Sequence, residues 1–198
     1  MSEDTRKAAI EAALQTYVDP YLGEPLGAAN AVRAVTEENG AFAAQIALGY
    51  PVGGYVEELR TALAAHLKAS GIDTGVTIEV VAEIRAHAVQ RGLQPVAEIR
   101  NIVAVASGKG GVGKSTVAVN LALAWAAQGA RVGLLDADIY GPSQPLMLGL
   151  AGERPGSPEG KHLRPLQAHG VAAMSIGFLV DAEQPMVWRG PMVTQALT

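Results

Sequence analysis

Apolar residues at helical spacing mark two segments in the first part of the chain. The pattern predicts a helix over residues 3–18, which the Asp19-Pro20 pair ends because proline disfavours a helical residue before it. A second helix is predicted over residues 55–69, where one face carries Val56, Leu59, Leu63 and Leu67.

Strand-like runs lie between and after these helices. Residues 31–36 and 41–48 flank the sequence E-N-G at 38–40, which is a strong hairpin signal because Asn and Gly accept positive φ. A third strand is expected over residues 76–84. The order helix, strand, strand, helix, strand predicts a small α+β domain over residues 1–85.

The rest of the chain has a different pattern. Residues 86–100 contain glycine and proline and are predicted to form a linker. In the part of the chain that follows this linker, predicted strands alternate with a predicted helix. This order predicts an α/β domain with a mainly parallel sheet. The predicted strands are residues 102–105, 131–135 and 171–176, and the alanine-rich helix is residues 117–128.

A glycine-rich segment connects the strand over 102–105 to the helix and fits the phosphate-loop pattern G-x4-G-K-[ST]. Its glycines let the backbone approach an anion closely, and its N–H groups form a concave surface with the helix N-terminus. Lys114 is expected to contact the β- and γ-phosphates of ATP, and the Ser115 hydroxyl to bind Mg²⁺. A chance glycine loop is the alternative, which the flanking strand and helix disfavour. The predicted nucleotide-binding residues are Gly108, Lys109, Gly110, Gly111, Val112, Gly113, Lys114, Ser115 and Thr116.

Two carboxylates follow the strand over 131–135. Asp136 and Asp138 point the same way if strand geometry continues, at the edge where open parallel sheets bind ligands. We expect Asp136 to hold Mg²⁺ through water and Asp138 to orient the water that attacks ATP. The alternative is an acidic turn that caps the next segment.

Composition narrows the function classes. The 198 residues are 49% hydrophobic and 17% charged, which is typical of a folded globular protein. A net charge of −4 with scattered basic residues argues against a nucleic-acid surface. The apolar runs are too short to span a membrane, and the N-terminus lacks the apolar core of a signal peptide. We therefore expect a cytoplasmic protein with no nucleic-acid or membrane partner.

Lys109 narrows the class of nucleotide-binding protein. Residues 109–116 resemble the deviant Walker A motif, K-G-G-x-G-K-[ST], of ATPases that include MinD, ParA, the nitrogenase iron protein and the Mrp/Nbp35 group. The resemblance implies that Lys109 reaches across a homodimer interface to the partner's nucleotide. The expected catalytic residues are then Lys109, Lys114 and Asp138. The alternative is that Lys109 is a solvated loop cation.

A longer set of motifs is more specific. The runs D-A-D-I-Y-G-P-S-Q-P at 136–145, S-I-G-F at 175–178 and W-R-G-P-M-V at 188–193 resemble the Mrp/Nbp35/ApbC group of iron–sulfur cluster carriers. The resemblance runs from about Asn101 to the end of the chain and places Asp138 in switch I. It implies an ATP-hydrolysing carrier that transfers clusters to apoproteins.

The sequence contains no cysteine, although thiolates are the usual ligands of iron–sulfur clusters. By resemblance, the family carries a C-x-x-C in the C-terminal half of the ATPase domain and a switch II segment, D-x-P-P-G, and neither occurs here. We therefore interpret the sequence as a truncated piece of a longer protein with weak or no ATPase activity by itself. A cluster is expected from the resemblance alone.

Residues 1–85 are similar to the MIP18-like domain (DUF59) that precedes the ATPase in many bacterial Mrp proteins. Asp19-Pro20 retains the family's D-P pair, for which a helix-ending turn is an equally good interpretation. The family's T-x-x-x-C-P loop corresponds to residues 48–54, which hold no thiol. Cluster or metal chemistry that depends on that thiol is therefore not expected in this domain.

Two other functions fit the same phosphate loop. One is a positioning ATPase of the MinD/ParA type, which the G-P-S-Q run and the N-terminal domain disfavour. The other is a non-enzymatic scaffold that nucleotide only stabilises. The expected organisation is an α+β domain (1–85), a linker (86–100) and the N-terminal part of a P-loop ATPase domain (101–198).

Overall fold

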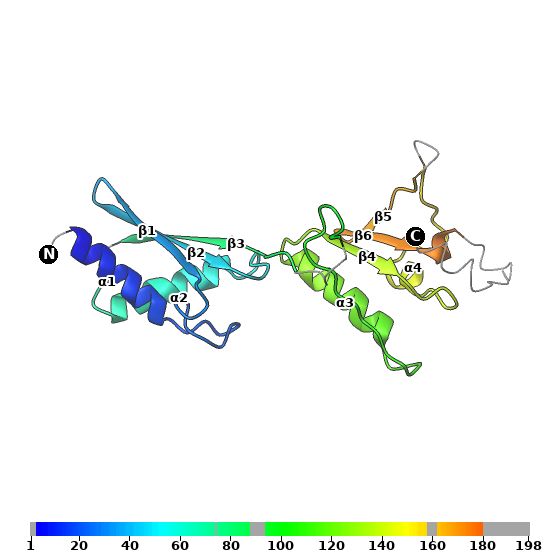
Figure 1. The fold of residues 1–198 in the computed structure, drawn as a ribbon, viewed down its shortest axis with the longest axis horizontal. Helices are drawn as coiled ribbons and strands as arrows, with labels where there is room; N and C mark the ends of the chain where they lie inside the picture. Colours follow the sequence, from blue (N-terminus) through cyan, green and yellow to red (C-terminus); the bar gives the residue numbers. More distant parts are fainter. Residues whose placement is uncertain (1–2, 74, 88–93, 158–161, 180–198) are drawn as a thin grey trace. The chain divides into compact units, whose positions relative to one another are not determined.

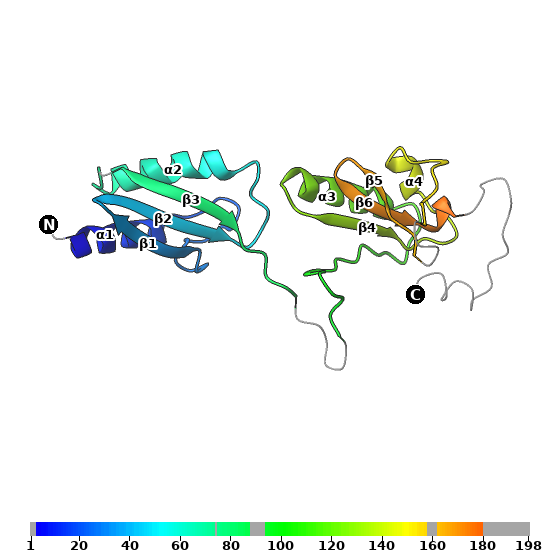
Figure 2. The same cartoon turned by 90° about the horizontal axis from the view of Figure 1, so that it is seen from above.

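The chain divides into two structural units, Met1–Ile102 and Val103–Thr198. The computed structural model describes residues 3–73, 75–87, 94–157 and 162–179. Each unit contains its own three-stranded sheet (Figures 1 and 2). The W-R-G-P-M-V motif at 188–193 lies outside the described residues.

In the first unit, two helices cover one face of the sheet (Figure 1). Strands β1 (Val32–Glu38) and β2 (Ala41–Leu48) pair antiparallel, and β3 (Val76–Ala82) pairs parallel with β2. The parallel pairing requires a crossover, which α2 (Val56–Ala69) supplies. Helix α1 (Glu3–Thr16) packs beside α2 and against β1.

A single hydrophobic core joins the helices to the sheet. Successive strand residues point to opposite faces, so alternate residues of β2 (Phe42, Ala44, Ile46 and Leu48) are buried under the helices. The predicted apolar face of α2 is confirmed, because Leu59, Leu63 and Leu67 are buried and Val56 is partly buried. The other main contributors are Ile10 and Leu14 from α1 and Val35, Phe42, Ile46 and Ile78 from the strands.

The predicted order of elements in this unit is confirmed. Asn39 and Gly40 turn the hairpin with φ of 55° and 80°, and both values lie in the left-handed region that a type I′ turn requires. Helix α1 ends at Thr16, before the predicted end at residue 18. The chain turns at Asp19, whose backbone carbonyl accepts the N–H of Gly23 at 2.8 Å.

The second unit has a mixed sheet with strand order β4-β6-β5. Strands β4 and β6 run parallel, whereas β5 and β6 form an antiparallel pair. Helix α3 packs on β4 and β6 through Val119, which shares a small core with Leu148, Ala173 and Phe178. The elements are α3 (Lys114–Ala127), β4 (Val132–Asp136), α4 (Gln144–Met147), β5 (Leu166–Ala168), β6 (Val171–Ser175) and the 3₁₀ turn η1 (Ile176–Phe178).

The α/β class of this unit is confirmed, but the strand predicted over residues 102–105 does not form. Residues 101–107 have no regular structure, and Ile102 and Val103 are 71% and 60% exposed. A β-branched run becomes a strand only when a neighbour pairs with it. In the described part of the chain β4 pairs with β6, and no strand pairs with 102–105.

Among the described residues, no helix has the length and apolar character that crossing a membrane requires.

Candidate phosphate-binding site

Residues 108–113 form an exposed loop that leads directly into α3. Gly113 is the N-cap of α3 with φ of 89°, and Gly111 has φ of 73°. Both values favour glycine, because a side chain is strained there. A Cβ atom added at either position meets no atom within 4 Å. Backbone conformation, rather than crowding from this chain, therefore accounts for glycine at these two positions.

The loop presents a continuous set of unpaired N–H groups. In the described part of the chain, the amides from Gly110 to Thr116 donate no hydrogen bond, whereas the Val117 N–H donates to the Gly113 carbonyl at 2.9 Å. The Lys109 N–H donates to the Ser107 hydroxyl at 3.1 Å, which begins the turn. Unpaired amides at the start of a 14-residue helix attract an anion, because the helix dipole adds partial positive charge.

The predicted lysines lie at both ends of this loop. Lys109 is exposed and Lys114, the first residue of α3, is half-buried. Neither ammonium group forms an ion pair within the described residues. Ser115 is half-buried in the first helical turn, and Thr116 beside it is exposed. The structure thus brings all nine predicted nucleotide-binding residues into one loop and helix start.

Asp136 ends β4 and is only 8% exposed. Its Oδ2 atom accepts the Ser175 hydroxyl at 3.1 Å and the Gln144 N–H at 3.2 Å. Its Oδ1 atom accepts the Asp138 N–H at 3.1 Å. Three donors offset the cost of burying this carboxylate and hold it in one orientation.

Asp138 lies in a different environment. Strand geometry does not continue past Asp136, so the premise that both carboxylates point the same way does not hold. Asp138 is exposed, and its Oδ1 atom accepts the Gly141 N–H at 3.1 Å in the turn after β4. The two acidic residues therefore differ in burial, with Asp136 fixed inside the unit and Asp138 open to solvent.

Gln144 connects the carboxylate end of β4 to the start of α3. Its backbone N–H belongs to the first turn of α4 and donates to Asp136, and its side-chain Nε2 donates to the Ser115 carbonyl at 3.1 Å. No role was predicted for Gln144 or Ser175 from the sequence. The G-P-S-Q run marks the segment of Gln144, but only the pairing of β4 with β6 shows that Ser175 faces Asp136.

In the first unit, the D-P pair forms a buried polar cluster. Asp19 is fully buried, and its Oδ1 atom accepts the N–H groups of Tyr21 and Leu22, both at 2.9 Å. The hydroxyls of Tyr50 and Tyr55 donate to the same carboxylate at 3.2 and 3.0 Å. Burial, together with the Asp19 carboxylate, raises the pKa of both tyrosines above their usual value. The cluster joins the loop after α1 to the loop before α2.

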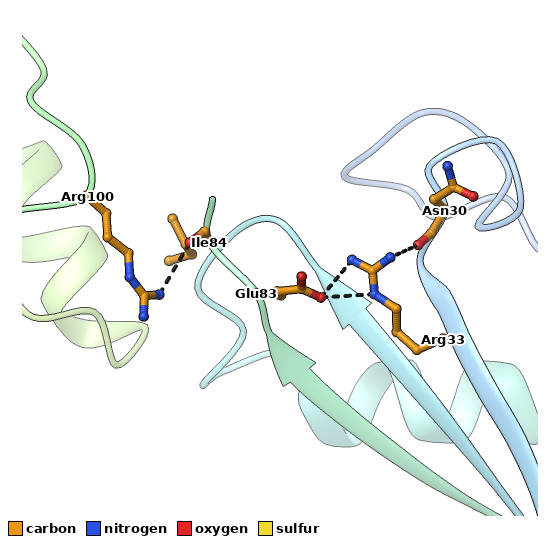
Figure 3. Close-up of polar contacts among 5 residues, drawn as sticks. All are labelled: Asn30, Arg33, Glu83, Ile84 and Arg100. Atoms are coloured by element: carbon orange, nitrogen blue, oxygen red, sulfur yellow. Dashed lines mark hydrogen bonds and ion pairs between the residues drawn. The ribbon is translucent and has the colours of Figure 1, made fainter. Parts of the chain in front are cut away.

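A polar pocket of about 480 Å³ also lies in the first unit. Arg33 donates to the Glu83 Oε2 atom from Nε and Nη2 at 2.9 and 2.7 Å, and to the Asn30 carbonyl at 2.9 Å (Figure 3). The Arg100 guanidinium donates to the Ile84 carbonyl at 3.3 Å. These contacts fasten the segment after β3 to the end of the sheet, so they account for Arg33 without a ligand.

No group of three or more His, Cys, Asp or Glu side chains that could hold a metal ion occurs within the described ranges. Ser115 in the first turn of α3 and Asp136 at the end of β4 offer oxygen ligands, and Gln144 contacts both residues. Hydroxyl and carboxylate oxygens suit Mg²⁺, which keeps most of its water and takes few protein ligands.

Comparisons with protein families divide the chain in two. A family model described as "NUBPL iron-transfer P-loop NTPase" matches residues 98–198, and one described as "Iron-sulfur cluster assembly protein" matches residues 7–80.

Individual proteins match between 38% and 96% of the chain. An iron-sulfur cluster carrier protein of Haemophilus influenzae is 43% identical over 194 residues, which are 96% of this chain and 51% of that protein. The mouse iron-sulfur cluster transfer protein NUBPL is 50% identical over 128 residues, 62% of this chain and 40% of that protein. A solved nucleotide-binding protein of Archaeoglobus fulgidus, in complex with ADP, is 48% identical over 38% of this chain and 31% of its own, with a TM-score of 0.36. The chain spans about half the length of the bacterial relatives it matches.

Proposed function

Because this chain belongs to the family of NUBPL iron-transfer P-loop NTPases, we propose that residues 108–116 bind the phosphates of ATP together with Mg²⁺. The bound nucleotide controls the carriage of an iron–sulfur cluster, which is the cargo rather than a resident cofactor. The observation that carries the proposal is the run of unpaired amides from Gly110 to Thr116 at the start of α3.

Each part of the loop has a separate role in this proposal. The amides bind the phosphate oxygens, because their N–H groups have no partner within the described residues and lie at the positive end of a helix. Lys114 adds a formal positive charge, which raises affinity for the β- and γ-phosphates. Thr116 is exposed beside Ser115 and can contact a further phosphate oxygen.

The metal role rests on Ser115 and Asp136. Mg²⁺ bound there would neutralise part of the phosphate charge during hydrolysis. Ser115 would contribute its hydroxyl, and Asp136 would bind through water, since its carboxylate already accepts three hydrogen bonds. Asp138 is open to solvent and free to orient an attacking water molecule.

Dimerisation and cluster transfer complete the proposal. Lys109 is exposed and unpaired within the described residues, so it is available to a nucleotide held by a second copy of the chain. The relatives are named iron-sulfur cluster carrier or transfer proteins, which supports delivery to acceptor proteins. These 198 residues contain no cysteine, so their contribution is the nucleotide-driven step rather than thiolate ligation.

The sharpest test replaces Lys114. In the Lys114→Ala protein, ATP binding measured by calorimetry should weaken at least tenfold, because a charge-assisted contact contributes about 1.5–3 kcal/mol. Lys68→Ala removes an exposed lysine from α2 in the other unit and is the matched control. Equal ATP affinity in Lys114→Ala and Lys68→Ala would refute the phosphate-site assignment.

A further inference from the structure

We propose that Gln144 is a positioning residue that sets the Mg²⁺ affinity of the nucleotide-loaded site. The inference rests on the proposed function and extends it to a residue outside the phosphate loop. It follows from one geometric fact: Gln144 contacts both residues assigned to the metal, with its backbone N–H on Asp136 and its side-chain amide on Ser115.

One contact holds the Asp136 carboxylate, and the other holds the backbone of Ser115. The N–H of Gln144 is the first of α4, so the Asp136 carboxylate caps that helix at 3.2 Å. The side-chain Nε2 reaches the Ser115 carbonyl at 3.1 Å, across 29 residues of sequence. A carbonyl only accepts hydrogen bonds, so the NH₂ end of the amide must face Ser115. Asp136 and Ser115 make no direct contact through these atoms, and Gln144 therefore holds one relative to the other.

The second amide atom argues against a purely structural role. Gln144 is only 4% exposed, and its Oε1 atom is buried without a hydrogen-bond partner in the described part of the chain. Leaving a buried acceptor unpaired disfavours folding, whereas an apolar side chain of the same length avoids that loss. A methionine or leucine at this position would leave no buried acceptor unpaired, so it should not lower the stability of the fold. The amide is therefore better explained by what it does to Ser115.

Metal binding and stability depend on different atoms of the Gln144 amide, namely Nε2 and Oε1. Replacing Gln144 with methionine keeps the backbone contact to Asp136 and the side-chain length but removes the contact to Ser115. The residue whose hydroxyl is assigned to Mg²⁺ is then held less firmly, so the ion should bind more weakly. Folding should not suffer, because the unpaired acceptor is removed as well.

The experiment uses the full chain loaded with ADP and titrated with MgCl₂ by calorimetry. In Gln144→Met the Kd for Mg²⁺ should rise about three- to tenfold, which is the range of one hydrogen bond. The Tm without ligand should stay equal or rise, and ADP affinity in EDTA should stay within about twofold. Gln167→Met, at an exposed position of β5, is the matched control and should change none of the three. Gln144→Leu is the second variant.

The Mg²⁺ affinity and the folding of the two Gln144 variants decide whether Gln144 positions Ser115 for the metal. A folded Gln144→Met or Gln144→Leu protein with the Mg²⁺ affinity of Gln167→Met overturns the inference, provided that Lys114→Ala loses ATP binding. Failure of both variants to fold also overturns it, because the amide would then be needed for structure. If Lys114→Ala binds ATP normally, the proposed function fails first and takes this inference with it.

Discussion

The Ser175 hydroxyl donates to the Asp136 carboxylate at 3.1 Å where β6 and β4 run side by side in register. Ser175 Oγ also accepts the Gly177 N–H at 3.1 Å, so the same side chain caps η1. Asp136 thereby receives donors from β6, from the turn after β4 and from α4. The fold itself holds this carboxylate in place beside the phosphate loop.

Ser175→Ala should therefore destabilise the second unit. The change removes a donor from a buried carboxylate and a cap from η1, which together cost about 1–3 kcal/mol in the free energy of unfolding. Urea denaturation followed by circular dichroism measures it. Ser157→Ala removes an exposed hydroxyl that bonds the His162 carbonyl and should cost less than about 0.5 kcal/mol. Equal losses in the two variants would contradict a special role for the Ser175–Asp136 contact.

Asp138→Asn should retain nucleotide binding and lose turnover. The side chain is exposed, and among the described residues it accepts a hydrogen bond only within its own turn, so removal of its charge should leave the phosphate loop intact. Loss of a group that orients water lowers kcat by about 10²–10⁴-fold. Phosphate release by the full chain, compared with ATP affinity from calorimetry, separates the two effects.

Asp73→Asn removes an exposed carboxylate from the first unit and is the control for Asp138→Asn. Turnover of Asp138→Asn equal to that of Asp73→Asn would remove Asp138 from the hydrolytic step. Loss of ATP affinity along with turnover would instead give Asp138 a binding role.

Lys109→Ala should separate ATP binding from ATP-dependent dimerisation. If Lys109 serves the nucleotide of a second copy, ATP affinity of the monomer should stay within about threefold, and turnover should fall at least about tenfold, because the missing contact is charge-assisted. Light scattering with a non-hydrolysable ATP analogue reports the dimer. Lys7→Ala, on the exposed face of α1, is the matched change. An undiminished ATP-dependent dimer in Lys109→Ala would favour the solvated-cation interpretation.

Local signals in the sequence predicted much of this fold. The Asn39-Gly40 turn, the apolar face of α2 and the loop before α3 each depend on residues within a few positions of one another. Backbone preference and helical periodicity act at that range, so a single sequence reveals them. The phosphate loop belongs to this class, because its residue types and order are local.

The features that the sequence did not predict depend on contacts between segments that are distant in the chain. Gln144 and Ser115 are 29 residues apart, and Ser175 and Asp136 are 39 residues apart. The packing of α4 against α3 sets the first contact and the pairing of β4 with β6 sets the second, and no local pattern in one element identifies its partner. The same reason explains the run over 102–105, whose β-branched residues predict a strand although no described strand pairs with it.

The Asp19 cluster predicts a loss of stability at high pH in the first unit. Burial, reinforced by the Asp19 carboxylate, raises the folded-state pKa of Tyr50 and Tyr55 above the unfolded value of about 10. Above that pH the unfolded chain loses protons that the folded chain keeps, so unfolding becomes more favourable as pH rises. The stabilising contribution is complete below about pH 10 and declines above it. Urea midpoints measured from pH 8 to 11 report the decline, and absorbance at 295 nm reports tyrosinate formation.

Tyr55→Phe tests the assignment. The variant should lose about 1–3 kcal/mol at pH 8, because Asp19 loses the donor at 3.0 Å, and its stability should fall less steeply above pH 10. Tyr140→Phe, which removes a 76% exposed hydroxyl in the other unit, should not change the stability of the first unit at pH 8. If Tyr55→Phe keeps the wild-type stability at pH 8 and the wild-type decline of stability above pH 10, the contact between Tyr55 and Asp19 does not stabilise the packing of the two loops.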